Sequence, residues 1–133
     1  MPKFSLRSKE RLGTCHKDIR KVCENVIKTY DITVLEGHRN KADQEQYFKA
    51  GKSLLHYPKS KHNVLPSLAV DLAPYPVDWD DTARFKEMWE VFKAVAQQLR
   101  ECGEITSEFA WGGNWKKFKD LPHIEIIKEK ECA

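Results

Sequence analysis

Apolar positions recur at three- and four-residue steps in two segments of the chain. The first segment carries Cys15, Ile19, Val22, Cys23, Val26, Ile27 and Tyr30. The second carries Phe85, Met88, Trp89, Phe92, Val95, Ala96 and Leu99. This spacing is typical of helices that bury one face. We therefore expect one helix near residues 15–30 and a longer one that starts at Asp80 or Asp81 and ends at Gly103, and the longer helix should be the main support of the core.

Short runs rich in apolar and β-branched residues predict strands. Such runs occupy residues 32–36, 68–73, 109–111 and 123–127. Glycines or prolines follow the first three runs, as is common where strands end.

A third helix and a long loop lie between the first two predicted strands. Asn40 is suited to cap a helix that runs through Phe48, and Gly51 is suited to the left-handed position beyond its end. Residues 52–67 contain two prolines and no clear period, which predicts a surface loop, and loops of this length are often functional. The order α-β-α-loop-β-α-β-β predicts an α+β fold with helices packed on an antiparallel sheet.

Length and composition exclude several classes of protein. The 133 residues suffice for one domain with one core, and 41% hydrophobic residues argue against disorder. The 23 Lys and Arg against 20 Asp and Glu give a net charge of +3, too balanced for a dedicated nucleic-acid-binding protein. No run approaches the roughly 20 apolar residues of a membrane span. The first residues also lack the apolar region of a signal peptide, so we expect synthesis and retention in the cytoplasm.

Four cysteines are present, which would allow two disulfides. Without export we expect them to be reduced, and the absence of a Cys-x-x-Cys motif argues against a cysteine zinc site. Cys15, Cys23 and Cys102 are expected to pack in the interior, whereas Cys132 is expected to be exposed.

Three residues that bind metals well lie at the edges of predicted elements: His62, Asp71 and His123. Two imidazoles and one carboxylate form a donor set that a catalytic Zn²⁺ uses while its fourth position stays open for water. Asp71 lies in an otherwise apolar strand, where an unpaired carboxylate is costly and a cation would relieve that cost. A salt bridge from Asp71 to Arg39 or to a lysine is the alternative.

Two acidic residues flank His123. Glu125 lies two residues further on and therefore on the same face of the strand, where it would either orient His123 or be a surface acid. Asp120 precedes His123 by three residues across a Leu-Pro turn. This spacing allows its carboxylate to lie beside a metal without binding it, which is the place of a general base.

Several separated motifs together resemble a known family. Ser60-Lys-His62, Ser67-Leu-Ala-Val-Asp71 and Asp120-Leu-Pro-His123-Ile-Glu125 are similar to the SxH, AxD and (D/E)xxH signature of the zinc D-Ala-D-Ala carboxypeptidase/VanX-like metallopeptidases. Within that family the chain most resembles phage endolysins that act as L-alanyl-D-glutamate peptidases. The likeness extends over nearly the whole chain, through residues 5–12, the helix after His16, and residues 35–39, 73–74 and 111–115.

The resemblance implies a fold and a set of roles. The fold would be a small hedgehog/D-Ala-D-Ala peptidase-like α+β domain. His62, Asp71 and His123 would bind one Zn²⁺ per chain, and Asp120 would be the catalytic base. Arg39 would face the polarised carbonyl or a substrate carboxylate, a role that suits its planar, permanently charged side chain, and a purely structural salt bridge is the alternative.

The resemblance also suggests roles for three residues near the metal ligands. Ser60 would hydrogen-bond the substrate or a ligand, although a serine in a loop often only forms a turn. Trp111 and Trp115 would line the cleft or belong to the core.

The chain departs from the family pattern between His62 and Asp71. Eight residues intervene where members usually have six, and Ser67 occupies a position usually held by glycine. An insertion of two residues preserves the face to which a strand residue points, so the ligand assignment is retained. The insertion leaves open the shape of the cleft floor, and therefore which bond of the substrate is cut.

The function implied is that of a zinc-dependent peptidoglycan peptidase cutting the peptide stem of the bacterial cell wall, at the L-Ala-D-Glu bond. A D-Ala-D-Ala dipeptidase or carboxypeptidase and a non-catalytic zinc-binding module are the alternatives. We expect residues 1–133 to form a single, monomeric catalytic domain with no separate wall-binding domain, which suits a thin Gram-negative wall. The resemblance to phage enzymes implies a separate holin that releases the enzyme from the host cytoplasm to the wall in the periplasm. We expect no insertion of the enzyme into the membrane and no nucleic-acid partner.

Overall fold

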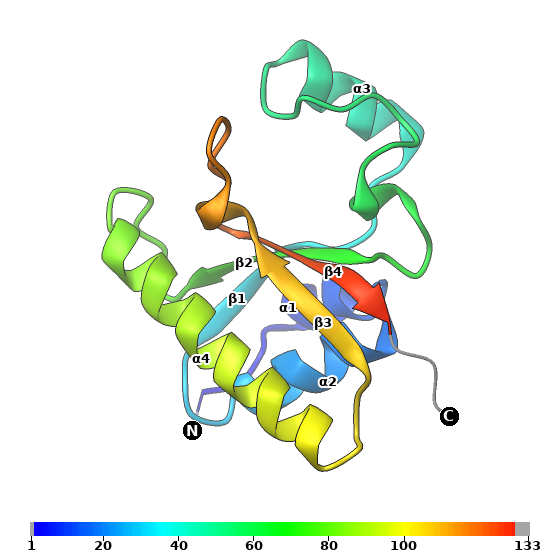
Figure 1. Ribbon diagram of the computed structural model, residues 1–133. Helices are drawn as coiled ribbons and strands as arrows, with labels where there is room; N and C mark the ends of the chain where they lie inside the picture. The colour runs from blue at the N-terminus through cyan, green and yellow to red at the C-terminus, as the bar shows by residue number, and fades with distance from the viewer. Residues whose placement is uncertain (1, 130–133) are drawn as a thin grey trace.

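One antiparallel sheet of four strands organises the chain. The computed structural model describes residues 2–129. Within this range the elements are α1 (Leu6–Leu12), α2 (Lys17–Val26), β1 (Ile32–Glu36), α3 (Lys41–Lys49), the 3₁₀ helix η1 (Lys61–Asn63), β2 (Ala69–Pro74), α4 (Thr82–Glu101), β3 (Ser107–Trp111), the 3₁₀ helix η2 (Gly112–Asn114) and β4 (His123–Glu129). The strand order is β1-β2-β4-β3, and every neighbouring pair is antiparallel (Figure 1). The predicted α+β fold is confirmed.

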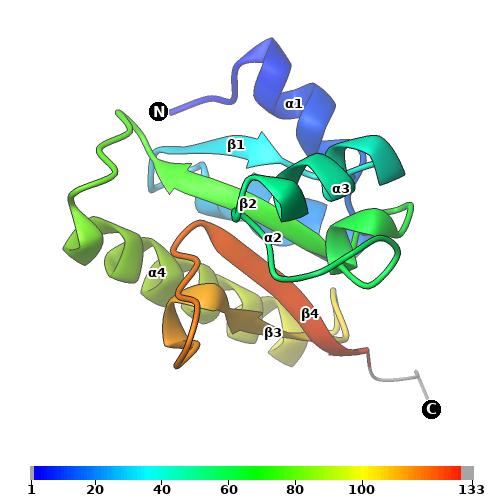
Figure 2. The ribbon, with the colours of Figure 1, turned by 90° about the horizontal axis from the view of Figure 1, so that it is seen from above.

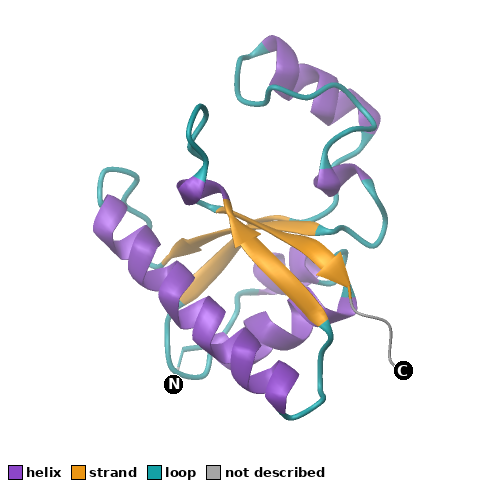
Figure 3. Cartoon of the chain, viewed as in Figure 1, coloured by secondary structure: helices purple, strands orange, loops and turns teal. Residues whose placement is uncertain are grey.

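The two long apolar stripes form the core on one side of the sheet. Helix α4 contacts β2 and β3, and α2 packs against α4 (Figure 3). The buried residues of α4 are Phe85, Met88, Trp89, Phe92, Ala96 and Leu99. Helix α3 and residues 112–122 lie on the other side of the sheet from α2 and α4 (Figures 1 and 2). This arrangement leaves the sheet face opposite the core for a functional site.

Helix α1 was not expected from the hydrophobic pattern. Ser5 caps it by accepting a hydrogen bond from the backbone of Ser8. The helix then covers the edge of β1 through polar contacts, because Ser8 Oγ accepts from Val34 N at 3.1 Å and Arg11 Nη1 donates to the Val34 carbonyl at 3.1 Å. Such contacts cover an edge strand without an apolar stripe, so the periodicity gave no sign of this helix.

The capping residues of α3 and α4 agree with the sequence prediction, whereas α2 is shorter than predicted. Asn40 caps α3, and Asp81 rather than Asp80 caps α4. Gly51 and Gly103 follow these helices with φ of 73° and 74°, the left-handed region that favours glycine. The helix expected near residues 15–30 spans only Lys17–Val26, because the chain turns before β1 begins.

The segment of residues 52–67 is only partly a surface loop. Residues 54–59 and 64–66 are exposed, but Ser60, His62, Asn63 and Ser67 are buried. Ser67 is held between backbone partners, since its N–H donates to the Thr14 carbonyl and its carbonyl accepts from His16 N, both at 2.8 Å. The buried residues of this segment therefore belong to the framework of the site.

The prediction of buried cysteines is correct for two of the three that the structure describes. Cys15 and Cys23 lie in the core, and burial raises the pKa of the Cys15 thiol to about 12. Cys102 is exposed, contrary to expectation, because it caps α4 beyond the last buried turn. All three are free thiols, and Cys132 lies outside the described residues. No helix among residues 2–129 has the length and apolar character to cross a membrane.

Candidate metal centre

The register of the sheet brings two of the predicted metal ligands together. Asp71 in β2 lies directly opposite His123 in β4. Paired residues of an antiparallel sheet project from the same face. The flanking residues Val70, Leu72 and Ile124 belong to the core cluster. Because side chains alternate along a strand, Asp71 and His123 point away from that core.

The third predicted ligand, His62, comes from η1. Ser60 caps this short helix, with its hydroxyl accepting from His62 N at 3.2 Å and its own N–H donating to Asn63 Oδ1 at 3.1 Å. The His62 carbonyl accepts from Arg39 N at 2.7 Å, which ties η1 to the segment after β1. The Ser60 hydroxyl therefore positions a ligand-bearing helix at the cleft wall.

Three donor atoms of these residues lie close to one another. His62 Nε2 is 3.1 Å from Asp71 Oδ1 and 3.2 Å from His123 Nδ1, and the remaining separation, between His123 Nδ1 and Asp71 Oδ1, is 3.4 Å. Ligand atoms about 2.0–2.1 Å from a tetrahedral Zn²⁺ would be about 3.3 Å apart. The three atoms are thus spaced like three corners of a zinc coordination tetrahedron, and among residues 2–129 this is the one such cluster of metal-binding groups.

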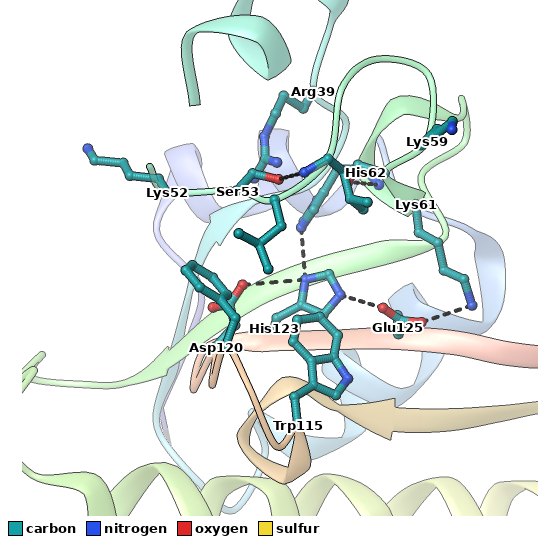
Figure 4. Close-up of a pocket in the computed structure, with 14 residues that line it drawn as sticks. Arg39, Lys52, Ser53, Lys59, Lys61, His62, Trp115, Asp120, His123 and Glu125 are labelled. Atoms are coloured by element: carbon teal, nitrogen blue, oxygen red, sulfur yellow. Dashed lines mark hydrogen bonds and ion pairs between the residues drawn. The ribbon is translucent and has the colours of Figure 1, made fainter. Parts of the chain in front are cut away.

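Hydrogen bonds on the outer side of both imidazoles set which nitrogen holds the proton. His62 Nδ1 lies 2.7 Å from the Gly37 carbonyl. His123 Nε2 lies 2.8 Å from Glu125 Oε1 (Figure 4). Both partners only accept, so these nitrogens donate, and in the neutral rings the inner nitrogens carry lone pairs. Three acceptor atoms then face one another, which suits a bound cation and the neutral-imidazole chemistry of metal ligation.

Gly37 gives His62 its hydrogen-bond partner at a position where no side chain fits. A Cβ added at residue 37 would overlap Thr14 Oγ1 and the Arg11 carbonyl. The close packing of this turn against the end of α1 therefore requires glycine and brings the Gly37 carbonyl to the imidazole.

The electrostatics of the cluster favour positive charge between the ligands. Burial opposes ionisation of Asp71, but His62 and His123 outweigh it and hold the pKa of this carboxyl well below its usual range. Burial also opposes the imidazolium form of His123, yet Asp71 and Glu125 raise the pKa of His123 to about 9. In the metal-free chain a proton is therefore held where a cation would bind, and metal binding must release it.

A cleft of about 360 Å³ opens beside the three ligands. Its lining combines Arg39, the loop after α3 and residues of η1 with residues from the segment 115–125 (Figure 4). The lining residues are Arg39, Lys52, Ser53, Leu54, Leu55, Lys59, Ser60, Lys61, His62, Trp115, Phe118, Asp120, His123 and Glu125. A volume of this size falls within the range of small-ligand sites in proteins.

Asp120 lies beside the donor cluster without joining it. Its Oδ2 is 4.0 Å from His123 Nδ1. Burial and the charge of Asp71 raise the pKa of Asp120 to about 6, although the nearby cations partly counteract this effect. Gly112 allows the approach, because a Cβ there would overlap the Asp120 carbonyl, and Asp120 N donates to the Gly112 carbonyl at 3.1 Å. A carboxylate with a pKa near neutrality thus faces the cleft.

Arg39 lies at the back of the cleft and is largely buried. It is ion-paired with Glu36, and its Nη1 donates to Gln44 Oε1 at 2.9 Å. Its Nη2 is 3.8 Å from Asp71 Oδ2, and the guanidinium lies over the Tyr47 ring. The salt bridge to Asp71 that the sequence left as an alternative is therefore present together with the donor cluster.

Gln44 is a site residue that the sequence analysis missed. It is fully buried, and its Oε1 accepts from both Arg39 and Asn63 Nδ2. Its Nε2 donates to Ser53 Oγ and to the Leu55 carbonyl. One glutamine in a polar helix gives no sequence signal, because all of these partners come from other segments.

Trp111 does not line the cleft, which corrects one of the predicted roles. It is buried in the core, its Nε1 donates to the Leu121 carbonyl at 2.6 Å, and its ring stacks on Trp89. The end of β3 turns this side chain toward α4. Trp115 does line the cleft, with its ring centroid 5.0 Å from that of His123.

Comparison with known proteins points to one group of enzymes. The sequence profile of the family described as phage L-alanyl-D-glutamate peptidase matches residues 1–129. The L-alanyl-D-glutamate peptidase of Escherichia phage T5 is 34% identical over 130 residues, covering 93% of this chain and 88% of the relative. The peptidoglycan L-alanyl-D-glutamate endopeptidase CwlK of Bacillus subtilis (strain 168) is 30% identical over 115 residues, covering 75% of this chain and 63% of the relative.

A solved structure shares the fold. The L-Ala D-Glu endopeptidase ChiX of Serratia marcescens superposes with a TM-score of 0.74 at 29% identity, covering 93% of this chain and 90% of the neighbour. Sequence and structure comparisons therefore agree.

Proposed function

Since the chain belongs to the phage L-alanyl-D-glutamate peptidase family, we propose that it is a zinc-dependent peptidoglycan peptidase that hydrolyses the L-Ala-D-Glu bond of the stem peptide. The observation that carries the metal part of this proposal is the set of three donor atoms 3.1–3.4 Å apart at the cleft. Family membership supports the substrate, and the donor set supports the cofactor.

His62, Asp71 and His123 would hold one Zn²⁺ per chain. Two nitrogen donors and one carboxylate oxygen suit zinc and leave a further position facing the cleft. Zinc bound there supplies a Lewis acid that polarises the scissile carbonyl and increases the acidity of water.

Asp120 carries the protons in this proposal. Its carboxylate takes a proton from the attacking water, and the resulting carboxylic acid gives a proton to the leaving amine of D-Glu. Burial raises the pKa of Asp120 in the metal-free chain and a bound cation would lower it, so the group would be ionised, and able to accept a proton, near neutral pH. Arg39 lies behind Asp71, where its fixed positive charge would stabilise the developing oxyanion or a substrate carboxylate.

The proposal extends to where and how the enzyme works. The buried apolar residues of the described chain form one cluster, which supports a single catalytic domain. This domain would act on the stem peptide as a monomer. As a member of a phage family, it would reach the wall from the host cytoplasm through a separate holin.

A D-Ala-D-Ala dipeptidase or carboxypeptidase would use the same residues. The relatives named above are all peptidases of the L-Ala-D-Glu bond, which favours the endopeptidase. A zinc-binding module without catalysis is disfavoured by Asp120, because a structural site needs no carboxylate beside an open position.

Digestion of purified sacculi tests the proposed function. We expect the zinc-loaded protein to release new amino groups, the chelator-treated protein to release none, and added zinc to restore the reaction. Magnesium in place of zinc should not restore it, because Mg²⁺ prefers six oxygen ligands. Release that persists after complete metal removal would contradict the metallopeptidase mechanism.

A further inference from the structure

Lys61 connects the two elements that carry the histidine ligands. It belongs to η1, next to His62, and its Nζ lies 2.9 Å from Glu125 Oε2. The same ammonium donates to the Ile126 carbonyl. Both partners belong to β4, the strand that begins with His123. One side chain thus fastens the 3₁₀ helix to the strand.

The contact with Glu125 continues to the metal ligands. Glu125 uses Oε2 for Lys61 and Oε1 for His123 Nε2, so both carboxylate oxygens are engaged (Figure 4). Glu125 is largely buried at 17% exposure, and Lys61 is 35% exposed. A carboxylate held at both oxygens has little freedom to rotate, so the imidazole that it orients is held as well.

We propose that Lys61 is a positioning residue for the metal centre, fixing Glu125 and through it the orientation of His123. The proposal rests on the proposed function, since it concerns the bound zinc ion. An ion pair this exposed adds little stability by itself, so its effect lies in geometry. Groups that hydrogen-bond a metal ligand directly, as Glu125 does, typically change metal affinity by about 10–100-fold, so a residue that acts through Glu125 is expected at the lower end of this range.

A second lysine of the same cleft provides a matched control. Lys59 also lines the cleft but forms no ion pair with any residue from 2 to 129. Replacing either lysine by methionine removes one positive charge and keeps most of the aliphatic stem. A difference between the two variants therefore reports the contacts of Lys61 with Glu125 and Ile126 and not the charge of the cleft, and a Glu125→Gln background separates the Glu125 contact from the other.

Zinc affinity, measured without substrate by competition with a chromophoric chelator, tests the proposal. We expect Lys61→Met to weaken zinc binding about tenfold. Lys59→Met should bind zinc within about twofold of the unaltered protein. Lys61→Arg, which keeps the positive charge, should retain most of the affinity that Lys61→Met loses. In a Glu125→Gln background Lys61→Met should have almost no further effect, because the two residues act in series.

The outcomes separate this inference from the proposed function. If the unaltered protein binds no zinc, the proposed function fails. If it binds zinc and Lys61→Met binds equally well, or if the losses in Lys61→Met and Glu125→Gln multiply, the inference about Lys61 is overturned alone. Melting of the metal-free variants detects general damage to the fold. A loss of affinity accompanied by an equal loss of metal-free stability, and not restored by Lys61→Arg, would also overturn it.

Discussion

Replacing Asp120 by asparagine is expected to lower kcat for stem-peptide hydrolysis by about 10²–10⁴-fold while one zinc ion remains bound. The amide keeps the shape of the side chain but cannot accept a proton from water or return one to the leaving amine. Zinc should remain because Asp120 Oδ2 lies 4.0 Å from His123 Nδ1, outside the cluster of donor atoms. Steady-state kinetics and zinc analysis of the same preparation measure both effects.

The pH profile gives this prediction a second readout. A base must be ionised, so activity of the unaltered enzyme should fall as the pH drops through the pKa of Asp120. That pKa is about 6 in the metal-free chain, and a bound cation lowers it, so the acidic limb should lie at or below pH 6. Asp120→Asn should lack this limb, whereas Asp80→Asn, which alters an exposed acid outside the cleft, should behave like the unaltered enzyme. Unchanged turnover in Asp120→Asn would contradict the role of Asp120 as the base.

Replacing His62 by alanine is expected to abolish stoichiometric zinc binding and to reduce activity by at least about 10³-fold, since a ligand contributes more than the outer partners that are worth about 10–100-fold. His62 Nε2 is the atom common to the two shortest contacts of the cluster. Its loss leaves only two of the three donors. Zinc content after dialysis, together with kinetics, measures the result.

An exposed histidine supplies the control for His62→Ala. His56 lies outside the cleft and pairs with Glu45, so His56→Ala should keep both zinc and activity. Circular dichroism of the metal-free proteins checks that His62→Ala remains folded. A folded His62→Ala variant that retained one zinc ion per chain would show that the metal lies elsewhere.

The ligand set could be predicted because its chemistry is unusual for its surroundings. Asp71 is a carboxylate in the apolar run that forms β2, and His123 begins the run that forms β4. Both residue types needed an explanation at these positions. The extra residues between His62 and Asp71 are accommodated before β2, and the register still places Asp71 opposite His123. Strand alternation was therefore sufficient to preserve the prediction.

The surroundings of the ligands could not be predicted, because they depend on tertiary contacts. Gln44 and Lys61 join segments that are distant in sequence, and neither residue type indicates a partner. Trp111 and Trp115 looked equivalent in sequence, but the turn at η2 sends one into the core and the other to the cleft. Helix α1 buries only Leu12 and Ser8 and contacts β1 through polar groups, so hydrophobic periodicity did not predict it.

Cleavage of a defined muropeptide identifies the bond that the enzyme hydrolyses and shows whether the reaction needs the metal. The substrate is an N-acetylmuramyl peptide with an intact stem, digested by zinc-loaded and by metal-free protein and analysed by mass spectrometry. With zinc we expect two products, the sugar retaining L-Ala and a free peptide with D-Glu at its amino terminus, and without metal we expect no reaction. Release of D-Ala or its dipeptide instead, or the same two products from metal-free protein, would contradict it.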